Sequence, residues 1–224
     1  LFYVMGFSRG RPLFNNEDTL AWVPVDQRAT LAYSFIDTLA DLHVLDPDAV
    51  GLGSLGKKED YIGRQIKAWY RSWESSIEFA QLDDPRAHEF KAFFLANQPA
   101  QVTASVVHGD YYLHNCLFSE GSKVSAVLDW ELATLGDPLA DLGYTLRAWP
   151  EIDDDPFLEP TAPTAVPGLP LRGELAQRYS ERTGFPVDLL DYYVGFNHWK
   201  TAAILHGVYA RYQAGQKSSE GVCL

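Results

Sequence analysis

The sequence has few of the residues that build disulfide frameworks or zinc sites. Only two of its 224 residues are cysteines, Cys116 and Cys223, and no Cys-x-x-Cys pair or Cys/His cluster occurs. This excludes a disulfide scaffold and argues against structural zinc. No apolar run reaches the roughly 18 residues that a membrane-spanning helix needs. Segment 1–7 is too short for the apolar core of a signal peptide and lacks a basic flank. We therefore expect a reduced, cytoplasmic protein with no membrane partner.

Basic residues are also scarce. The chain has 18 Lys and Arg against 30 Asp and Glu, a formal net charge of −12. Nucleic-acid affinity depends on clustered Lys and Arg, so a nucleic-acid partner is not expected. The balance favours a neutral or cationic substrate, or an anionic one whose charge is neutralised by metal ions. With 46% hydrophobic and 21% charged residues, the composition is that of a globular protein.

The residue pattern predicts a mostly helical α+β fold around a small hairpin. Helical spacing is expected over about 26–44, 59–82, 85–97, from the turn at 136–138 to about 149, and over 171–183, 187–197 and 198–213. Extended segments are expected at 1–5 and 102–107, with a hairpin formed by 116–118 and 124–128. The proline-rich stretch 150–170, which contains Asp153–Asp155, is expected to be a surface insertion.

Three segments carry the chemistry: HGDYYLHN at 108–115, LDWE at 128–131 and GDPLADL at 136–142. They place a carboxylate and a carboxamide, Asp110 and Asn115, five residues apart in one loop. A second carboxylate, Asp129, follows the hairpin. Mg²⁺ takes a few protein oxygens and keeps the rest of its shell for water and phosphate. One Asn and one Asp suit such a site, and the remaining Asp can orient a hydroxyl and accept its proton.

These segments resemble the aminoglycoside phosphotransferase and choline kinase group, whose fold is protein-kinase-like. The closest resemblance is to the phosphotransferase domains found beside acyl-CoA dehydrogenases. FYVMGFSRGRPL near the start and HWKTAAILHGVYARYQAGQ near the end support it. The resemblance implies ATP and Mg²⁺ as cofactors. It also implies these roles: Asp110 as catalytic base, Asn115 and Asp129 as metal ligands, Met5, Gly6 and Phe7 as the hinge against adenine, and His108, Asp137 and Asp141 as structural support.

The resemblance begins at the hinge. Kinases of this group carry upstream a strand Lys, its partner Glu and a loop over the nucleotide, and none of these is present. We therefore expect residues 1–12 to be a hinge strand and linker and residues 13–224 to be a C-terminal lobe. The chain is expected to be part of a longer protein, and by itself to bind ATP weakly and transfer phosphate poorly.

The sequence is compatible with two classes of acceptor. The acidic composition suits an amino-sugar or amino-alcohol, whereas the dehydrogenase-linked resemblance suggests a hydroxyacyl-CoA or hydroxy acid and a fused or neighbouring acyl-CoA dehydrogenase. A dimer is another possible arrangement. A catalytically silent kinase-like binding module is the main alternative function. A phosphohydrolase using His108 and Asp110 is poorer, because two-metal sites cluster several His and Asp ligands.

Single residues near the motifs have simpler interpretations as structure. His108 is expected to pack with a ring nitrogen on a backbone carbonyl, and His43 to be a core histidine. Cys116 is expected to be buried and Trp130 to lie in the core. His114 is ambiguous and Glu131 is as readily a salt-bridge partner as a ligand neighbour. Gly109 stands where regulated protein kinases carry an Arg that senses a phosphorylated loop, which favours a small-molecule acceptor.

Overall fold

The computed structural model describes residues 6–151, 154 and 159–215. The expected strand at 1–5, and with it Met5, lies outside the described residues, as do Asp153 and Asp155. The described part contains the helices α1 (Asn16–Trp22), α2 (Arg28–His43), α3 (Tyr61–Ala80), α4 (Pro85–Ala96), α5 (Pro138–Leu146), α6 (Arg172–Thr183) and α7 (Leu190–Gln213). Short 3-10 turns occupy Val25–Gln27, Leu113–Asn115 and Trp130–Leu132.

Four short strands form two antiparallel pairs. They are β1 (Ser105–Val107), β2 (Cys116–Phe118), β3 (Val124–Val127) and β4 (Thr134–Gly136). The predicted hairpin is present as β2 and β3, with an irregularity between Leu117 and Phe118. The predicted extended segment at 102–107 forms β1, which pairs with β4. Sequence analysis missed β4, because a three-residue strand ending in glycine becomes a strand only through its partner.

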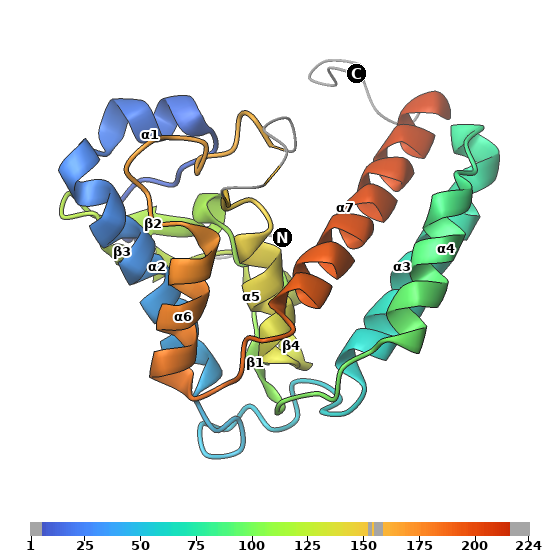
Figure 1. The fold of residues 1–224 in the computed structure, drawn as a ribbon, viewed down its shortest axis with the longest axis horizontal. Coiled ribbons are helices and arrows are strands. Elements are labelled where there is room, and N and C mark those ends of the chain that lie inside the picture. Colours follow the sequence, from blue (N-terminus) through green and yellow to red (C-terminus); the bar gives the residue numbers. More distant parts are fainter. Residues whose placement is uncertain (1–5, 152–153, 155–158, 216–224) are drawn as a thin grey trace.

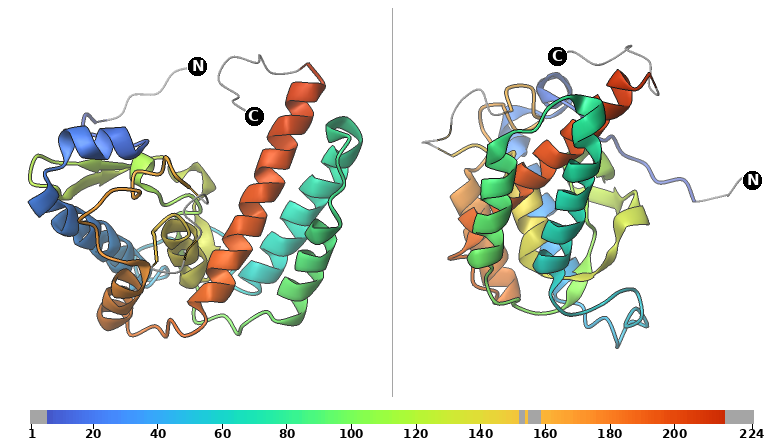
Figure 2. Two further views of the ribbon diagram at one scale, coloured as in Figure 1. Left: turned by 45° about the horizontal axis from the view of Figure 1, so that its top comes forward. Right: turned by 90° about the vertical axis from the view of Figure 1, so that its right-hand side faces the viewer.

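The helices form two groups (Figures 1 and 2). Helices α3, α4 and α7 lie side by side, and α7 also packs against α5. On the other side of α5, α2 packs against α6 and β1. Helix α5 therefore stands between the two groups, and the loops that carry the sequence motifs run beside it. None of the described helices is both long and apolar enough to cross a bilayer.

Local sequence explains where several helices begin. Asp137 and Asp84 precede Pro138 and Pro85, and their carboxylates accept hydrogen bonds from Leu139 N at 3.1 Å and Arg86 N at 3.0 Å. Proline fits the first turn of a helix because that N–H has no intrahelical partner. The N-terminal ends of α4 and α5 were therefore predictable. Helix α1 was not predicted. It begins at the cap Asn15, whose side chain accepts from Asp18 N.

The C-terminal helices predicted as 187–197 and 198–213 are one continuous helix, α7. The predicted break is wrong because Asn197 does not compete with the helix there. Its amide donates to the carbonyl of Tyr193 one turn earlier and to that of Ala140 on α5. The buried contact with α5 therefore holds the helix continuous through a residue that often ends helices.

Two further expectations are wrong. Residues 159–170 are not simply a surface insertion, because Ala162, Thr164 and Val166 are buried and the carbonyl of Pro163 accepts from Thr19 on α1. Trp130 is not in the core. Its side chain is 43% exposed, and its indole N–H bonds the carbonyl of Val127.

The core holds the loop at 108–115 from beneath. Tyr111 is fully buried and stacks on Phe35 of α2 with ring centroids 4.6 Å apart, while its hydroxyl donates to the carbonyl of Phe35 at 2.9 Å. Trp149 also stacks on Phe35, with ring centroids 5.8 Å apart. Because Tyr111 follows Asp110 directly, core packing fixes the position of the loop that carries the candidate base.

Candidate active site

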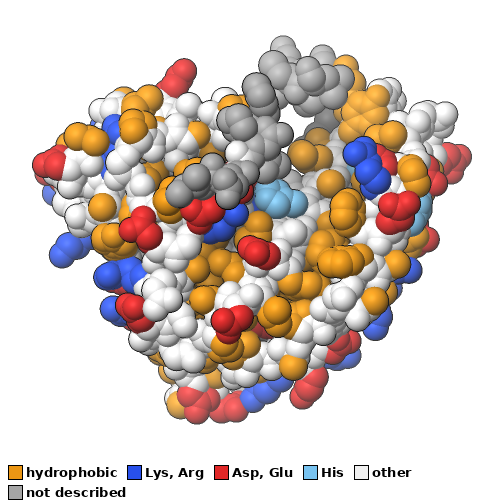
Figure 3. All heavy atoms as spheres, in the orientation of Figure 1, with side chains coloured by type: hydrophobic (Ala, Val, Ile, Leu, Met, Phe, Trp, Pro, Cys, Tyr) orange, Lys and Arg blue, Asp and Glu red, His pale blue; other side chains and the backbone are white. Residues whose placement is uncertain are grey.

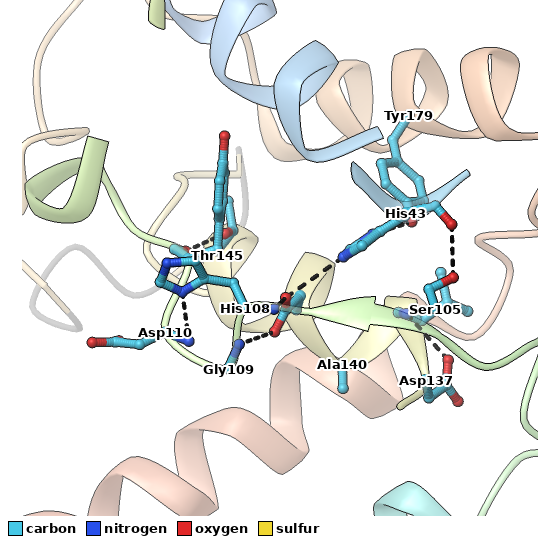
Figure 4. A network of polar contacts seen from close by, with 12 residues as sticks. His43, Ser105, His108, Gly109, Asp110, Asp137, Ala140, Thr145 and Tyr179 are labelled. Atoms are coloured by element: carbon cyan, nitrogen blue, oxygen red, sulfur yellow. Dashed lines mark hydrogen bonds and ion pairs between the residues drawn. The ribbon is translucent and has the colours of Figure 1, made fainter. Parts of the chain in front are cut away.

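Asp141 of α5 holds the start of the loop, at His108 and Gly109, which are labelled in Figure 4. Its carboxylate accepts hydrogen bonds from the backbone N–H groups of His108 at 2.5 Å and Gly109 at 3.0 Å. His43 faces the same carboxylate, with Nε2 3.5 Å from Oδ2, and its Nδ1 lies 2.6 Å from the Tyr179 hydroxyl. Burial raises the pKa of Asp141, but His43 and the two N–H donors outweigh it and lower the pKa below its usual value. Each oxygen of the Asp141 carboxylate thus accepts one backbone N–H, and the lowered pKa favours its ionised form.

Gly109 is required by the backbone at this point. Its φ is 85°, in the left-handed region, and a Cβ there would lie 2.9 Å from the carbonyl oxygen of Leu132. Any other residue would meet both backbone strain and a backbone clash. The position that resembles a regulatory Arg in protein kinases therefore has no room for a side chain here.

His108 connects the loop to the end of the hairpin. Its Nε2 lies 2.8 Å from the carbonyl of Leu128, and its Nδ1 accepts from Asp110 N at 3.3 Å. The expected bond from a ring nitrogen to a backbone carbonyl is thus present, and the ring is fully buried. A carbonyl accepts and the Asp110 N–H donates, so the imidazole carries its proton on Nε2. The His108 ring therefore links Asp110 to Leu128, the residue before Asp129.

Asn115 contacts Asp110 directly. Its amide nitrogen donates to the Asp110 backbone carbonyl at 2.9 Å and to the Asp110 carboxylate at 3.0 Å. The amide oxygen of Asn115 is thereby left as a donor atom for a cation. The side chain is buried, with 7% exposed. The geometry therefore orients both the carboxylate and the amide oxygen within one loop.

Asp129 lies beside Asn115 along the hairpin backbone. Leu128 N donates to the Asn115 carbonyl at 2.7 Å, and Asp129 follows with a left-handed φ of 63°. Such a conformation is uncommon for a residue other than glycine. Both Asp110 and Asp129 act on His114: burial lowers the His114 pKa, and the two carboxylates oppose that shift. The structure thus places Asn115 in contact with Asp110 and sets the backbone of Leu128, the residue before Asp129, against Asn115, whereas a shared site for all three side chains stays a prediction.

The donor set fits a Mg²⁺–nucleotide complex and no denser metal site. Within the described residues, no group of three or more His, Cys, Asp or Glu could hold a metal ion. An amide oxygen and a carboxylate leave most of an octahedral shell to water and phosphate, which is how Mg²⁺ is commonly held in phosphoryl-transfer sites.

Asp137 supports the site from a greater distance. Besides capping α5, it accepts a hydrogen bond from the Tyr193 hydroxyl of α7 at 2.8 Å. Burial raises the pKa of Asp137, and the bonds from Tyr193 and Leu139 oppose the shift. Asp137 therefore ties α5 to α7 and does not face the Asp110 loop.

The expected hinge residues are only partly described. Gly6 and Phe7 are exposed, and Phe7 is 90% exposed. Farther along, Arg11 pairs with Phe118 of β2 through two backbone hydrogen bonds of 2.9 Å. The segment 8–12 is thus attached to the hairpin. The contact of residues 5–7 with adenine stays a prediction.

Sequence analysis missed two residues beside the loop, Lys200 and Tyr144. Lys200 of α7 is buried, and its ammonium donates to the Gly109 carbonyl at 3.3 Å. Tyr144 of α5 lies next to Asp110: burial raises the pKa of Tyr144 and the Asp110 carboxylate raises it further. A lone lysine between apolar residues on a helix, as in HWKTAA, was the available signal for Lys200.

Two cavities flank α7. One, of about 300 Å³, is lined by Tyr61, Gln65, Trp69, Ser72, Gly109, Leu132 and Lys200, among others. The other, of about 400 Å³, lies between α4 and α7 and is mainly apolar, with Phe90, Phe94, Trp199 and His198 in its wall. Figure 3 shows hydrophobic side chains gathered over this region. The first cavity is the one that reaches the candidate catalytic loop.

Comparison with known proteins gives the family. A profile of the phosphotransferase enzyme family matches residues 1–170. The chain is 34% identical over 225 residues to mouse acyl-CoA dehydrogenase family member 10, a match that covers 97% of this chain and 20% of the mouse protein. The curated relatives are thus far longer than this chain, which spans between a fifth and somewhat over a quarter of the first two.

Solved structures show the same fold. A Ralstonia eutropha protein provisionally classed as an aminoglycoside phosphotransferase superposes with a TM-score of 0.80 at 30% identity, over 96% of this chain and 65% of the other. The fold also matches a ternary complex of streptomycin, ATP and an aminoglycoside phosphotransferase, with a TM-score of 0.53 at 17% identity, over 97% and 68% of the two chains. The expected mostly helical, kinase-like C-terminal lobe is confirmed. With its profile match, its relatives and its fold in agreement, this chain belongs to the phosphotransferase enzyme family.

Proposed function

We propose that this chain forms the acceptor-binding lobe of an ATP- and Mg²⁺-dependent phosphotransferase that phosphorylates a hydroxyl of a small molecule. The observation that carries the proposal is the contact between Asn115 and Asp110. One amide group holds the candidate base by its nitrogen and leaves its oxygen for a cation. A base and a metal ligand side by side are what phosphoryl transfer requires from this face of the site.

Asp110 acts as the base. It orients the acceptor hydroxyl and accepts its proton as the oxygen attacks the γ-phosphorus of ATP and the bond from that phosphorus to the leaving ADP breaks. Asn115 and Asp129 would hold Mg²⁺, the one with its amide oxygen and the other with its carboxylate. When bound, Mg²⁺–ATP supplies the transferable phosphoryl group and the positive charge that neutralises it. Asp141, through the N–H groups of His108 and Gly109, keeps the loop from moving during the reaction. The hinge residues Met5, Gly6 and Phe7 are proposed to meet adenine.

A small-molecule acceptor is favoured over a protein. Only the 3-10 turn Trp130–Leu132 and Ala133 separate Asp129 from β4. No long segment is available there to act as a phosphorylation-controlled loop, and Gly109 cannot be replaced by a sensing Arg. The acceptor is proposed to be a hydroxyacyl-CoA-type molecule or an amino-sugar or amino-alcohol. The names of the relatives of this chain favour a link to acyl-CoA dehydrogenases.

The test compares the rate of phosphate transfer by the full-length gene product with the rate of its Asp110→Asn variant. Removal of a general base lowers turnover by about 100-fold or more. Asp191→Asn, at the exposed start of α7, is the matched control and is expected to keep normal turnover. If the Asp110 variant keeps turnover within a few-fold of the wild type, Asp110 is not the base. The 224-residue chain alone is expected to turn over much more slowly than the complete protein.

A second candidate is a catalytically silent kinase-like binding module. It is the alternative function that the sequence leaves open, because the described residues do not by themselves demonstrate turnover. ATP turnover that depends on Asp110 excludes a catalytically silent binding module. Tight ligand binding without any turnover in the complete protein supports it.

A further inference from the structure

A buried lysine stands next to the candidate base in a protein that is strongly acidic. Lys200 is 8% exposed, although the chain has a net charge of −12. Its ammonium lies 3.3 Å from the carbonyl of Gly109, the residue immediately before Asp110. Buried lysines are rare unless they are paired, because burial removes the hydration of the charge. This residue therefore requires an explanation.

The described residues do not supply a paired counter-charge. Among them, no carboxylate lies within the 4.0 Å ion-pair distance of the Lys200 ammonium. The carboxylates that influence it are Asp141 and Asp110, which act at longer range. Asp141 is already occupied by two backbone N–H groups and His43. Burial lowers the pKa of Lys200, and the two carboxylates only oppose that shift. A single neutral carbonyl is thus the only hydrogen-bond acceptor that the described chain gives this ammonium.

Aromatic rings take the place of anions around the ammonium. Its nitrogen lies 4.8 Å from the ring centroid of Tyr144 and 5.6 Å from that of Trp69. On the Tyr144 ring a second cation is found, since Cζ of Arg147 lies 4.2 Å from the centroid. Nε of Arg147 is buried without a hydrogen bond, and its Glu159 contact is 3.8 Å long. Two cations, Lys200 and Arg147, thus lie against the ring of Tyr144, and of these Arg147 is paired with Glu159.

Lys200 also lines an open space. The cavity of about 300 Å³ extends from Lys200 and Gly109 to Gln65 and Ser72 of α3. Its wall contains one cation, several neutral polar groups and the indole of Trp69. A cavity with few but directed polar groups is typical of small-molecule sites. The cavity begins at Gly109, the residue immediately before Asp110.

We propose that this cavity is an anion-selective acceptor site in which Lys200 binds a carboxylate or phosphate carried by the acceptor. The proposal rests on the proposed function and narrows its acceptor class. The anionic group supplies the counter-charge that Lys200 lacks, and the hydroxyl of the same molecule lies toward Asp110. Arg147, which lies against the same Tyr144 ring as Lys200, adds to the positive potential. Acceptors whose only charge is an amine are disfavoured, because they bring a second cation to Lys200.

The test measures binding to the full chain without nucleotide. The probes are β-hydroxybutyrate and the butanediol and aminobutanol of the same length. Lys200→Gln removes the charge and Lys200→Arg keeps it, while Lys67→Gln on the exposed face of α3 is the matched control. The wild type is expected to bind the hydroxy acid about ten-fold more tightly than the diol, as befits one charge-assisted hydrogen bond. Lys200→Gln abolishes this preference, Lys200→Arg retains part of it, and Lys67→Gln leaves it unchanged.

A second pair of probes separates the two sources of the anion. β-Hydroxybutyryl-CoA carries phosphates, and the matching pantetheine thioester carries none. A preference for the CoA thioester that disappears in Lys200→Gln assigns the site to the coenzyme phosphates, whereas a preference for the free acid assigns it to the carboxylate. The proposal is overturned if the wild type binds the hydroxy acid and the diol equally and also binds the CoA and pantetheine thioesters equally. It is likewise overturned if the wild type binds aminobutanol more tightly than the hydroxy acid. These wild-type results decide the matter even if Lys200→Gln fails to fold.

The outcome is distinguishable from failure of the proposed function. Anion preference without turnover of any acceptor leaves the site intact and contradicts the transferase. Turnover that depends on Asp110 but is fastest with amino-alcohols leaves the transferase intact and contradicts the anion site. Asp110→Asn is expected to lose turnover and keep the anion preference, since Lys200 binds the far end of the acceptor.

Discussion

The amide nitrogen of Asn115 lies 3.0 Å from the carboxylate of Asp110, and the same nitrogen also donates to the Asp110 carbonyl. One side chain therefore fixes both the backbone and the carboxylate of the candidate base. The amide oxygen is left for a cation at the same time. This division of roles between the nitrogen and oxygen of one carboxamide leads directly to a mutational test.

Substitution of Asn115 should separate the metal from the base. Asn115→Ala removes both contacts, so we expect turnover to fall and the Mg²⁺ concentration at half-maximal activity to rise, each by about ten- to a hundred-fold. Asn115→Asp keeps an oxygen ligand but sets a second carboxylate against Asp110. It should keep most of the Mg²⁺ affinity and still lose turnover. Titration of activity with Mg²⁺ checks both variants, and an unchanged Mg²⁺ requirement in Asn115→Ala would exclude Asn115 as a ligand.

Asp141 should contribute to stability in a pH-dependent way. Asp141→Asn gives one of the two backbone N–H groups a neutral, weaker acceptor, leaves the other facing an NH2 group that cannot accept, and removes the charge that faces His43. We expect a loss of about 1–3 kcal/mol in the free energy of unfolding near neutral pH. Chemical denaturation measures it, with Asp191→Asn as the surface control.

The direction of the pH dependence follows from the lowered pKa of Asp141. Its stabilisation is fully present above the unfolded value of about 3.9 and is lost as the pH falls toward the lower folded value. The wild type should therefore lose this part of its stability in acid, and Asp141→Asn should not. Parallel acid profiles for the two proteins would contradict the assignment. The pKa of Asp137 is raised, so its contribution to the pH dependence of stability has the opposite sign. Asp137→Asn should therefore not remove the loss of stability in acid.

Gly109 should tolerate no side chain. In Gly109→Ala the new Cβ lies 2.9 Å from the Leu132 carbonyl at a φ of 85°. We expect about 1–3 kcal/mol of destabilisation and a marked loss of turnover, because the strain falls on the residue before Asp110. Gly121→Ala is the control, since nothing lies within 4 Å of its Cβ position. Urea denaturation of both variants should show a change only for Gly109→Ala.

Two tryptophans should differ sharply in their contribution to stability. Trp149 is fully buried and stacks on Phe35, whereas Trp130 is 43% exposed. Trp149→Ala should cost about 3–5 kcal/mol. Trp130→Ala should cost much less, because 43% of its surface is already in water and its side-chain hydrogen bond is one indole N–H to Val127. Similar unfolding free energies for the two variants would show that the exposed placement of Trp130 is wrong.

Much of the local structure was predictable from particular residues. Asp84–Pro85 and Asp137–Pro138 marked two helix starts because the cap and the proline act within one turn. His108 was expected to bond a backbone carbonyl, and it does. The helix break before His198 was predicted wrongly, since the contact of Asn197 with Ala140 cannot be seen in the sequence. The interpretation of Trp130 failed for a related reason, because hydrophobicity does not say which face of a loop meets water.

The sequence by itself determined the order of chemical groups, Asp110, Asn115 and then Asp129, because motif spacing and turn residues act over a few positions. It also determined the helical character of most segments. Tertiary structure alone decided that Lys200, 91 residues beyond Gly109, lies against the carbonyl of that residue, and that β4 is a strand at all. Such contacts join segments far apart in the chain, and their energies come from burial and long-range pairing that no local pattern encodes.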